Sequence, residues 1–400
     1  MIDLTKVLNI SQEFIQNPYP SYSKMLSSNE PFWLPTSDQK GFDGIWLFSQ
    51  YSQARFILKL DSDKISKQIE KIMPESVPTI LDGTMLNTDP PNHQRLRKLA
   101  SEAFSPSMLK NIEPRIRSIT QTLVKKIKKN NATDFITSVA LPLPVGIIAY
   151  MMGVPDCDQS LVQGWAIDIL KGIDSSNKSQ KIIDKQKKSH DDLSRYFTNL
   201  ISLKDKNPDD SICSNLTQAF NNKKICFDEL IKMCIFLLIV GYETTTGLIG
   251  NGLYCLLKYP DQLKLLRKNP DLLENAIEEI LRFESPFQRT SFRVTANECQ
   301  IGNVIYNPGQ LIGIVIGAAN RDPLIFQDPN SFDIKRTNNK HIAFGLGIHA
   351  CLGSYLARLE AKICLDYLIK SFKNIELLEQ PTWNSTSVIR NLSALKIICN

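Results

Sequence analysis

The chain has 400 residues, 42% of them hydrophobic and 22% charged, which is typical of a globular protein with a sizeable core. Its net charge of +6 is mild, whereas nucleic-acid-binding domains usually show a stronger and more clustered excess. Nine cysteines, an odd number without a CxxC pair, indicate a reducing compartment. The first residues lack the features of a signal peptide, so we expect a cytoplasmic protein without a membrane anchor.

The first part of the chain alternates short β-like runs with a helical pattern, which predicts a β-rich lobe over about 20–60. Residues of about 89–285 are expected to form the helical bulk. Within it, 135–155 carry no charge, but Pro142 and Pro144 would break a helix exposed to lipid. A buried turn followed by a core helix is therefore predicted there.

Residues 227–258 form the longest predicted helix, and its centre is apolar on every side, so it should run through the core. A helix follows at 270–283, then short strands in 299–322, and another helix at about 353–372. No repeat or linker divides the chain. We expect a single domain over 1–400, mainly α with small β-sheets, ending in a β and cysteine-loop region over about 286–400.

Cys351 stands in a glycine-rich loop directly before the last long predicted helix. Gly345, Gly347 and Gly353 leave the backbone bare enough for a flat partner to approach. The start of the helix directs N–H groups at the sulfur, and His349 adds possible positive charge. Each of these features favours the thiolate over the thiol.

Several kinds of site are compatible with a lone cysteine. A cysteine buried for packing before a helix is one of them. A closed zinc site is disfavoured because only His341 and His349 lie nearby in the sequence, and a nucleophile would need a base that is not evident. A single thiolate backed by N–H donors and faced by glycines suits the axial ligand of a haem iron.

Residues 344–353, FGLGIHACLG, match at every fixed position the haem-binding signature FGxGxHxCxG of the cytochrome P450 family. The chain resembles the soluble bacterial members of that family from about residue 17 to its end. The resemblance implies the cytochrome P450 fold, with haem b between the central helix and the helix after the cysteine loop. It also implies that Cys351 is the metal ligand and that Phe344, Gly345 and Gly353 bind the cofactor.

The segment VGYETTT, residues 240–246, breaks helix propensity in the middle of the central helix. The Thr244 hydroxyl can bond back to the Val240 carbonyl and open the helix locally, although a satisfied polar cluster would look the same. Gly241, Glu243 and Thr244 match the family's oxygen-activation pattern. The resemblance implies that they are the groove glycine, the proton-delivering acid and the adjacent alcohol, while Val240 departs from the small residue expected.

Basic residues at four separate places resemble the family's ligands of the haem propionates. Prolines suited to a helix start precede His93 and Arg97, which fall at i and i+4 on one helical face. Arg293 and His349 are the other two candidates. By the same resemblance, Glu279 and Arg282 form a buried ExxR pair with Arg336, and these three residues are structural.

The resemblance implies a monooxygenase that inserts one oxygen atom from O2 into an apolar or biosynthetic small molecule. Electrons then come from a ferredoxin and an NAD(P)H-dependent reductase, and a carrier protein presenting the substrate is a further candidate partner. We expect the ferredoxin on the thiolate side, where basic residues gather: Lys335, Arg336, Lys340, Arg358 and Lys362.

Two alternatives remain open at this point. The same haem site could catalyse desaturation, oxidative coupling or peroxide-driven oxidation, although peroxide users in the family tend to lack the acid–alcohol pair. A non-catalytic haem sensor or electron carrier is disfavoured, because no histidine or methionine lies near Gly241 to serve as a sixth ligand. The expected substrate pocket is largely apolar and suits a fatty acyl chain, a terpenoid, a polyketide or a peptide. Its candidate residues are Phe236, Val240, Phe287, Ser291 and the Ser387–Val388 pair.

Overall fold

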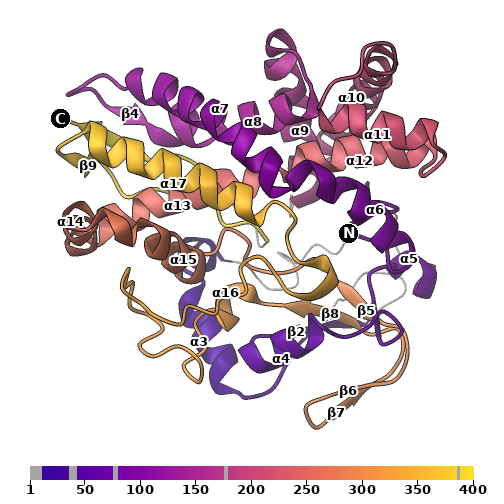
Figure 1. The fold of residues 1–400 in the computed structure, drawn as a ribbon. Coiled ribbons are helices and arrows are strands. Elements are labelled where there is room, and N and C mark those ends of the chain that lie inside the picture. The colour runs from indigo at the N-terminus through magenta and orange to yellow at the C-terminus, as the bar shows by residue number, and fades with distance from the viewer. Residues whose placement is uncertain (1–10, 36–42, 75–79, 175–178, 385–387) are drawn as a thin grey trace.

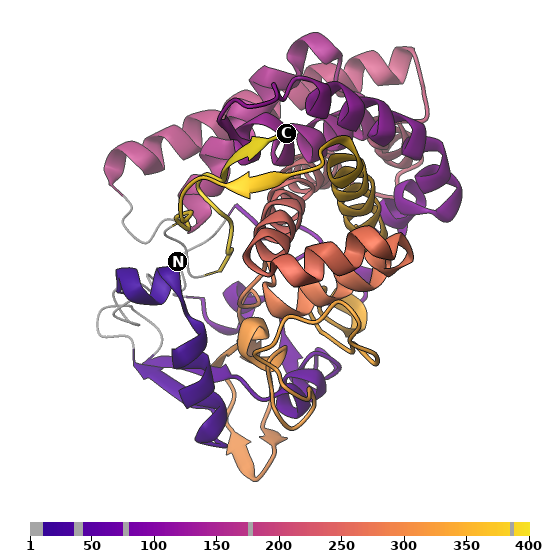
Figure 2. The same cartoon turned by 90° about the vertical axis from the view of Figure 1, so that its left-hand side faces the viewer.

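The computed structural model describes residues 11–35, 43–74, 80–174, 179–384 and 388–400. Helices make up most of the molecule, and the main sheet lies at one end of it, at the bottom of Figure 1. The view in Figure 2 shows the same division, with the helices stacked above the sheet. The predicted fold class, mainly α with small sheets, is confirmed.

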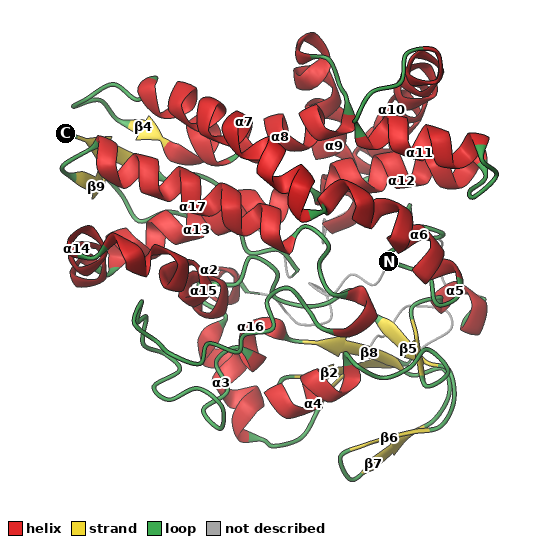
Figure 3. Cartoon of the chain, in the orientation of Figure 1, coloured by secondary structure: helices red, strands yellow, loops and turns green. Residues whose placement is uncertain are grey.

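The main sheet has five strands in the order β1-β2-β8-β5-β3. Strands β2 and β8 are parallel, and the other neighbours are antiparallel. Two smaller sheets have the orders β4-β10-β9 and β6-β7, and Figure 3 shows β4 and β9 close to the C-terminus. The strand bounds are β1 Phe32–Pro35, β2 Gly44–Phe48, β3 Ile65–Ser66, β4 Thr133–Asp134, β5 Arg293–Thr295, β6 Cys299–Ile301, β7 Val304–Tyr306, β8 Leu311–Ile314, β9 Ile375–Leu377 and β10 Lys396–Cys399.

The helices of the first half of the chain are α2 Gln12–Gln16, α3 Tyr19–Ser27, α4 Tyr51–Ile57, α5 Ile69–Ile72, α6 Asn92–Ser101, α7 Pro106–Lys125, α8 Pro142–Met152, α9 Gln159–Asp174 and α10 Gln180–Lys206. Those of the second half are α11 Ile212–Asn221, α12 Phe227–Val240, α13 Glu243–Lys258, α14 Pro260–Lys268, α15 Leu273–Phe283, α16 Ile316–Ala319 and α17 Ser354–Ser371. Helix α17 agrees with its predicted span to within a residue at each end.

The uncharged segment around residue 140 lies in the core. A π-helical turn, Ile136–Ala140, leads into α8, whose residues are buried except for Pro142 and Tyr150. Pro142 occupies the first position of α8, where a helix needs no N–H donor. The predicted buried turn and core helix are confirmed.

The central helix predicted over 227–258 is interrupted close to the place where the sequence suggested a local opening. Residues 241–242 form a turn that separates α12 from α13. A Cβ on Gly241 would lie 2.6 Å from Ile148 of α8, so glycine allows the two helices to pack closely. The whole stretch Phe227–Lys258 is apolar and long enough to cross a membrane, but 78% of its most apolar window is buried inside the fold, as in a core helix.

A buried charge cluster joins α15 to the loop before the cysteine loop. The Glu279 carboxylate accepts two hydrogen bonds of 2.8 Å from the Arg282 guanidinium, and neither side chain is exposed. Arg336 donates to the same carboxylate at 3.1 Å, and the Asn339 amide and the Asp333 backbone N–H each donate to it at 3.0 Å. Glu279, Arg282 and Arg336 therefore meet, as the ExxR pattern suggested.

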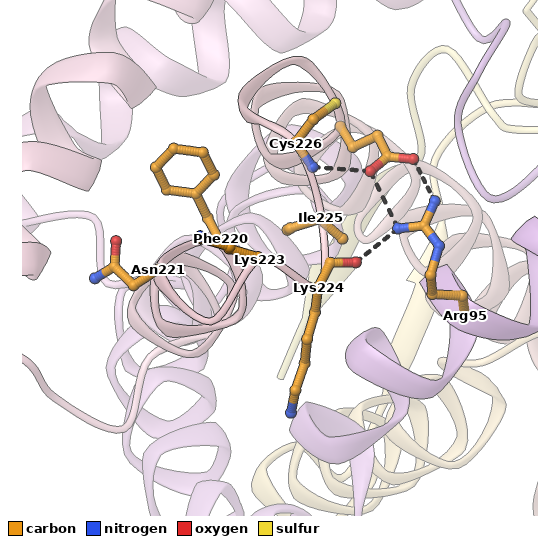
Figure 4. A pocket seen from close by; sticks show the side chains of 8 residues that line it. Arg95, Phe220, Asn221, Lys223, Lys224, Ile225 and Cys226 are labelled. Atoms are coloured by element: carbon orange, nitrogen blue, oxygen red, sulfur yellow. Dashed lines mark hydrogen bonds and ion pairs between the residues drawn. The ribbon is translucent and has the colours of Figure 1, made fainter.

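Helix α6 is tied to the start of α12 by Arg95. The Arg95 guanidinium pairs with Glu229 and donates to the Lys224 backbone carbonyl at 2.8 Å. Figure 4 shows Arg95 facing Lys224 and Cys226. Glu229 also accepts from the Cys226 backbone N–H at 3.0 Å. These contacts line a shallow surface pocket, and they fix the helix that carries His93 and Arg97 against the helix that leads to the site.

Candidate active site

An internal cavity of about 290 Å³ lies between the α12–α13 junction and the cysteine loop. Its walls are mostly apolar, and polar or charged groups are confined to a few positions. The apolar lining includes Met85, Leu86, Leu170, Phe236, Ile239, Val240, Leu248, Pro286, Phe287, Phe344, Leu352 and Ile389. An apolar cavity with a few convergent polar groups is the usual form of a small-molecule site.

The cysteine loop presents Cys351 to this cavity. Gly345 and Gly347 take φ values of +67° and +72°, which non-glycine residues rarely adopt. A Cβ on Gly347 would lie 2.3 Å from the Leu58 carbonyl oxygen, so this glycine also permits a close backbone approach. Gly353 has a negative φ and precedes α17 as its N-cap residue, so it does not use the conformational freedom expected of it.

The electrostatic setting of Cys351 differs from the expectation. Burial raises the pKa of the thiol, while a hydrogen bond from the Gly353 backbone N–H and the charges of Arg97 and Arg358 lower it only in part. The N–H at the start of α17 favours the thiolate as expected, but in the protein alone burial outweighs it. Bonding to a metal ion would supply the missing stabilisation of the thiolate.

Three cationic side chains face the same part of the cavity: Lys67, Arg97 and Arg293. Burial lowers the pKa of each of them, to about 10 for Arg293. The Arg97 guanidinium also donates to the Ala350 carbonyl at 2.7 Å, which ties α6 to the cysteine loop. The buried Asp89 carboxylate acts on Lys67 and Arg293. A further anionic partner would balance the remaining positive charge.

His93 and His349 pack against one another beside these cations, with ring centroids 4.2 Å apart. Both nitrogens of His93 and Nε2 of His349 are buried without a hydrogen-bond partner among the residues that the structure describes. Burial, and then the charges of Lys67, His93, Arg293 and Arg97, lower the pKa of His349 to about 2. His349 is therefore neutral and does not supply the positive charge expected beside the cysteine.

Lys67 was missed by the sequence reasoning. Its side chain is 2% exposed, and its Nζ donates to the Ser291 hydroxyl at 2.6 Å and to the Phe292 carbonyl at 2.9 Å. The segment ISKQIEK contains nothing that distinguishes this lysine from a surface lysine. Pairing of β3 with β5 buries it, and that contact joins segments more than 200 residues apart.

Glu243 and Thr244, the first two residues of α13, both line the cavity. The hydroxyl that bonds back to a main-chain carbonyl is that of Thr246, which donates to Tyr242 at 2.9 Å, and not that of Thr244 as expected. The turn at 241–242 explains why Thr246 and not Thr244 makes this bond, because α13 begins only after the turn. Gly241 faces α8 and is not part of the cavity lining.

The predicted substrate-pocket residues divide into two groups. Phe236, Val240, Phe287 and Ser291 line the cavity, although the Ser291 hydroxyl is engaged by Lys67. Val388 is not part of the lining, and its neighbour Ile389 takes that place, because successive side chains of an extended segment point to opposite sides. Ser387 lies outside the described residues.

The basic residues expected on the thiolate side are largely neutralised. Arg336 binds Glu279, Arg358 binds Glu278, and Lys362 pairs with Glu274. Burial opposes ionisation of Glu278, but hydrogen bonds from Arg358 and His341 outweigh it and lower its pKa to about 2. Three of the five predicted docking charges are therefore paired with acidic residues of this chain, and of these the pair of Lys362 is exposed.

Comparison with known proteins gives consistent matches. Residues 165–391 match the family model described as Cytochrome P450. The chain is 34% identical to Cytochrome P450 107B1 of Saccharopolyspora erythraea, covering 99% of this chain and 98% of that one. It is also 34% identical to the Biotin biosynthesis cytochrome P450 of Bacillus subtilis, over 92% of both. The crystal structure of P450BioI in complex with hexadec-9Z-enoic acid ligated acyl carrier protein has a TM-score of 0.89 and 33% identity, covering 97% of this chain and 100% of that one.

Proposed function

The chain belongs to the cytochrome P450 family and is a haem-dependent monooxygenase, and we propose that it oxidises an apolar acyl chain with electrons from a separate ferredoxin. The observation that carries the proposal is the cavity itself. It places a cysteine thiol, a patch of buried cations and an acid–alcohol pair around one apolar space.

The residues around the cavity fit a haem group. The buried nitrogens of His93 and His349, which lack hydrogen-bond partners in the described chain, lie beside Arg97 and Arg293, and two propionates would satisfy this cluster. The thiol of Cys351 would bind the iron, and the apolar side chains of Phe344 and Leu352 would pack against the ring. We propose that Lys67 belongs to the propionate-binding cluster as well.

Bound haem supplies dioxygen activation, and the protein's part is to hold the substrate, exclude water and deliver protons. We propose that the Glu243 carboxyl passes protons to the Thr244 hydroxyl, which releases them into the cavity on the side facing Cys351. Both residues begin α13, where the helix dipole favours the ionised carboxylate between transfers. Gly241 is better assigned to helix packing against Ile148 than to proton delivery.

The substrate class follows from the wall chemistry. Phe236, Val240 and Phe287 provide apolar surface, and Val240 keeps 41% of its surface exposed. An acyl chain matches these walls, and the similarity to a P450BioI structure holding an acyl carrier protein supports a carrier as the form in which the chain arrives. A cytoplasmic location and an NAD(P)H-dependent reductase complete the proposal.

Titration with hexadec-9Z-enoic acid, free and as the acyl carrier protein thioester, tests the proposal. We expect a Soret shift with one of the two forms, and an oxidised product that carries oxygen from O2 when a surrogate ferredoxin and reductase are added. Phe236→Ala should weaken binding, whereas Phe56→Ala, on an exposed side chain of α4, should not. Absence of both shift and product with either form would refute the acyl substrate.

A further inference from the structure

Asn391 reaches the helix that carries the proposed proton-delivering acid. Its side-chain Nδ2 donates to the backbone carbonyl of Glu243 at 3.0 Å, and the residue is 5% exposed. The carboxamide lies in a slot over Gly247: a Cβ there would be 1.9 Å from Asn391 Oδ1. This slot exists only because residue 247 has no side chain.

A second carboxamide fastens the same segment from the helix side. Asn251, two turns further along α13, is fully buried, and its Nδ2 donates to the Arg390 carbonyl at 2.8 Å and to the Glu284 carbonyl at 3.2 Å. Residues 390 and 391 are thus held to α13 by two amide side chains. The Asn251 amide donates from α13 to the segment, and the Asn391 amide donates from the segment to α13. We call this arrangement, Asn391 with Glu243 and Asn251 with Arg390, the amide clasp.

The clasped segment is continuous with the substrate-facing wall of the cavity. Ile389 lines the cavity and pairs with Phe287, which lines it too. The Arg390 N–H donates to the Pro286 carbonyl at 2.7 Å, and the Gln288 N–H donates to the Val388 carbonyl at 2.7 Å. Main-chain hydrogen bonds therefore join residues 388 and 390, next to Asn391, to the wall segment that carries Phe287.

The outer side of the segment is fixed. The Arg390 guanidinium is ion-paired with Glu284, donates to the Ile15 carbonyl at 2.7 Å and lies 3.6 Å above the Trp383 ring. Arg390 is therefore held on its outer side, while its neighbours Ile389 and Asn391 face the cavity and α13. The hydrogen bond from the Asn391 amide to the Glu243 carbonyl links the cavity wall to α13.

We propose that Asn391 is a positioning residue that couples the substrate-facing wall to the backbone of Glu243. A substrate that fills the cavity presses on Phe287 and Ile389 and sets Asn391 against the Glu243 carbonyl. That contact orients the first turn of α13 and so aims the Glu243 carboxyl at Thr244. The inference rests on the proposed role of Glu243 and Thr244 in proton delivery.

Two variants break the bond in different ways. Asn391→Asp keeps the shape of the side chain and removes the amide donor. Gly247→Ala keeps asparagine at position 391, but its methyl group occupies the space of the Asn391 carboxamide and displaces it. Both should have the same effect, and the double variant should be no worse than either single one.

Asn275→Asp is the matched control. The Asn275 amide likewise donates to a backbone carbonyl, that of Ile334 at 2.6 Å, but it lies outside the cavity lining. The three single variants and the unaltered enzyme are compared as holoenzymes, with myristic acid as the probe. Hydrogen exchange of the peptide spanning 241–248 is measured without the probe, so that it does not depend on the substrate class.

Asn391→Asp and Gly247→Ala should raise the share of electrons lost to hydrogen peroxide severalfold at an unchanged dissociation constant for myristic acid. Asn391→Asp should also speed exchange in 241–248, and Asn275→Asp should change neither quantity. Because a protonated carboxyl regains a donor, coupling in Asn391→Asp should recover as the pH falls below the raised pKa of a buried aspartate. The unaltered enzyme should show no such recovery.

The outcomes separate this inference from the proposed function. If Thr244→Ala raises the peroxide share and Asn391→Asp does not, the coupling role of Asn391 is refuted while proton delivery stands. If Asn391→Asp speeds hydrogen exchange in 241–248 but leaves the share of electrons lost to hydrogen peroxide unchanged, the clasp is only a packing contact. That result would also refute the coupling. If neither myristic acid nor hexadec-9Z-enoic acid, free or as the acyl carrier protein thioester, gives product with any enzyme, the acyl substrate is rejected. Unchanged hydrogen exchange of 241–248 in Asn391→Asp would then overturn the clasp by itself.

Discussion

The Glu279 carboxylate and the Arg336 guanidinium meet at 3.1 Å, although 57 positions separate them in the chain. The carboxylate has no exposed surface and also holds Arg282. Because Glu279 balances two buried cations, Glu279→Gln should lower the free energy of unfolding by about 3–5 kcal/mol, measured by chemical denaturation.

The control for this variant is Glu274→Gln, which removes a pair with Lys362 whose side chains are 75% and 44% exposed. An exposed pair of this kind contributes about 0–1 kcal/mol. Equal losses in the two variants would show that the buried cluster has no special weight.

Acid should weaken the neighbouring pair of Glu278 and Arg358 in a defined pH window. The pKa of Glu278 is lowered from 4.5 in an unperturbed chain to about 2 in the folded protein, so the stabilisation is complete above pH 4.5 and is lost toward pH 2. The unfolding free energies of the unaltered protein and Glu278→Gln should differ by roughly 2 kcal/mol at neutral pH, and the difference should shrink toward zero as the pH falls. A difference that grew with acid would contradict the assignment, and Glu113→Gln, in an exposed pair, should show no such trend.

The sequence predicted features that depend on local pattern. The spacing of apolar residues predicted α17, and the glycines around Cys351 predicted a loop that a flat partner can approach closely. The ranges of the strands around 32–48 and 299–314 were also close to those observed, whereas β5 was not predicted. Of the residues proposed for the site, Cys351, Glu243, Thr244, Arg97 and Arg293 all line one cavity.

Features that depend on distant contacts could not be predicted. Lys67 looks like a surface lysine until β3 pairs with β5. That Ile389 lines the cavity in place of the predicted Val388 depends on which side of an extended segment faces inward. The break at 241–242 arises partly because α8 packs against Gly241. Asn391 offers no local signal at all, because its function depends on the slot at Gly247.

Removing the buried cation at residue 67 should loosen the cofactor. Lys67→Met should speed haem transfer to apomyoglobin about tenfold, which corresponds to about 1.4 kcal/mol, because one positive group facing the propionates is lost. The same change should not destabilise the apoprotein strongly, since it also relieves repulsion with Arg293. Lys64→Met, three residues away and solvent-exposed, is the control, and a transfer rate equal to that of the unaltered enzyme would remove Lys67 from the cofactor site.

The acid–alcohol pair should control where the electrons go. Thr244→Ala should leave haem content and substrate binding intact while hydrogen peroxide per NAD(P)H consumed rises severalfold, because proton delivery from Glu243 is interrupted. Thr245→Ala, at a buried position outside the cavity lining, should behave as the unaltered enzyme does. Unchanged product per electron in Thr244→Ala would exclude this residue from proton delivery.

The sulfur of Cys351 as the iron ligand is the centre of the account, and the spectrum of the reduced carbon monoxide complex tests it most directly. The purified protein and a Cys364→Ser variant, which alters a buried thiol of α17, should both show the red-shifted band typical of thiolate ligation. Cys351→Ser should lose that band. Its survival in Cys351→Ser would contradict the account.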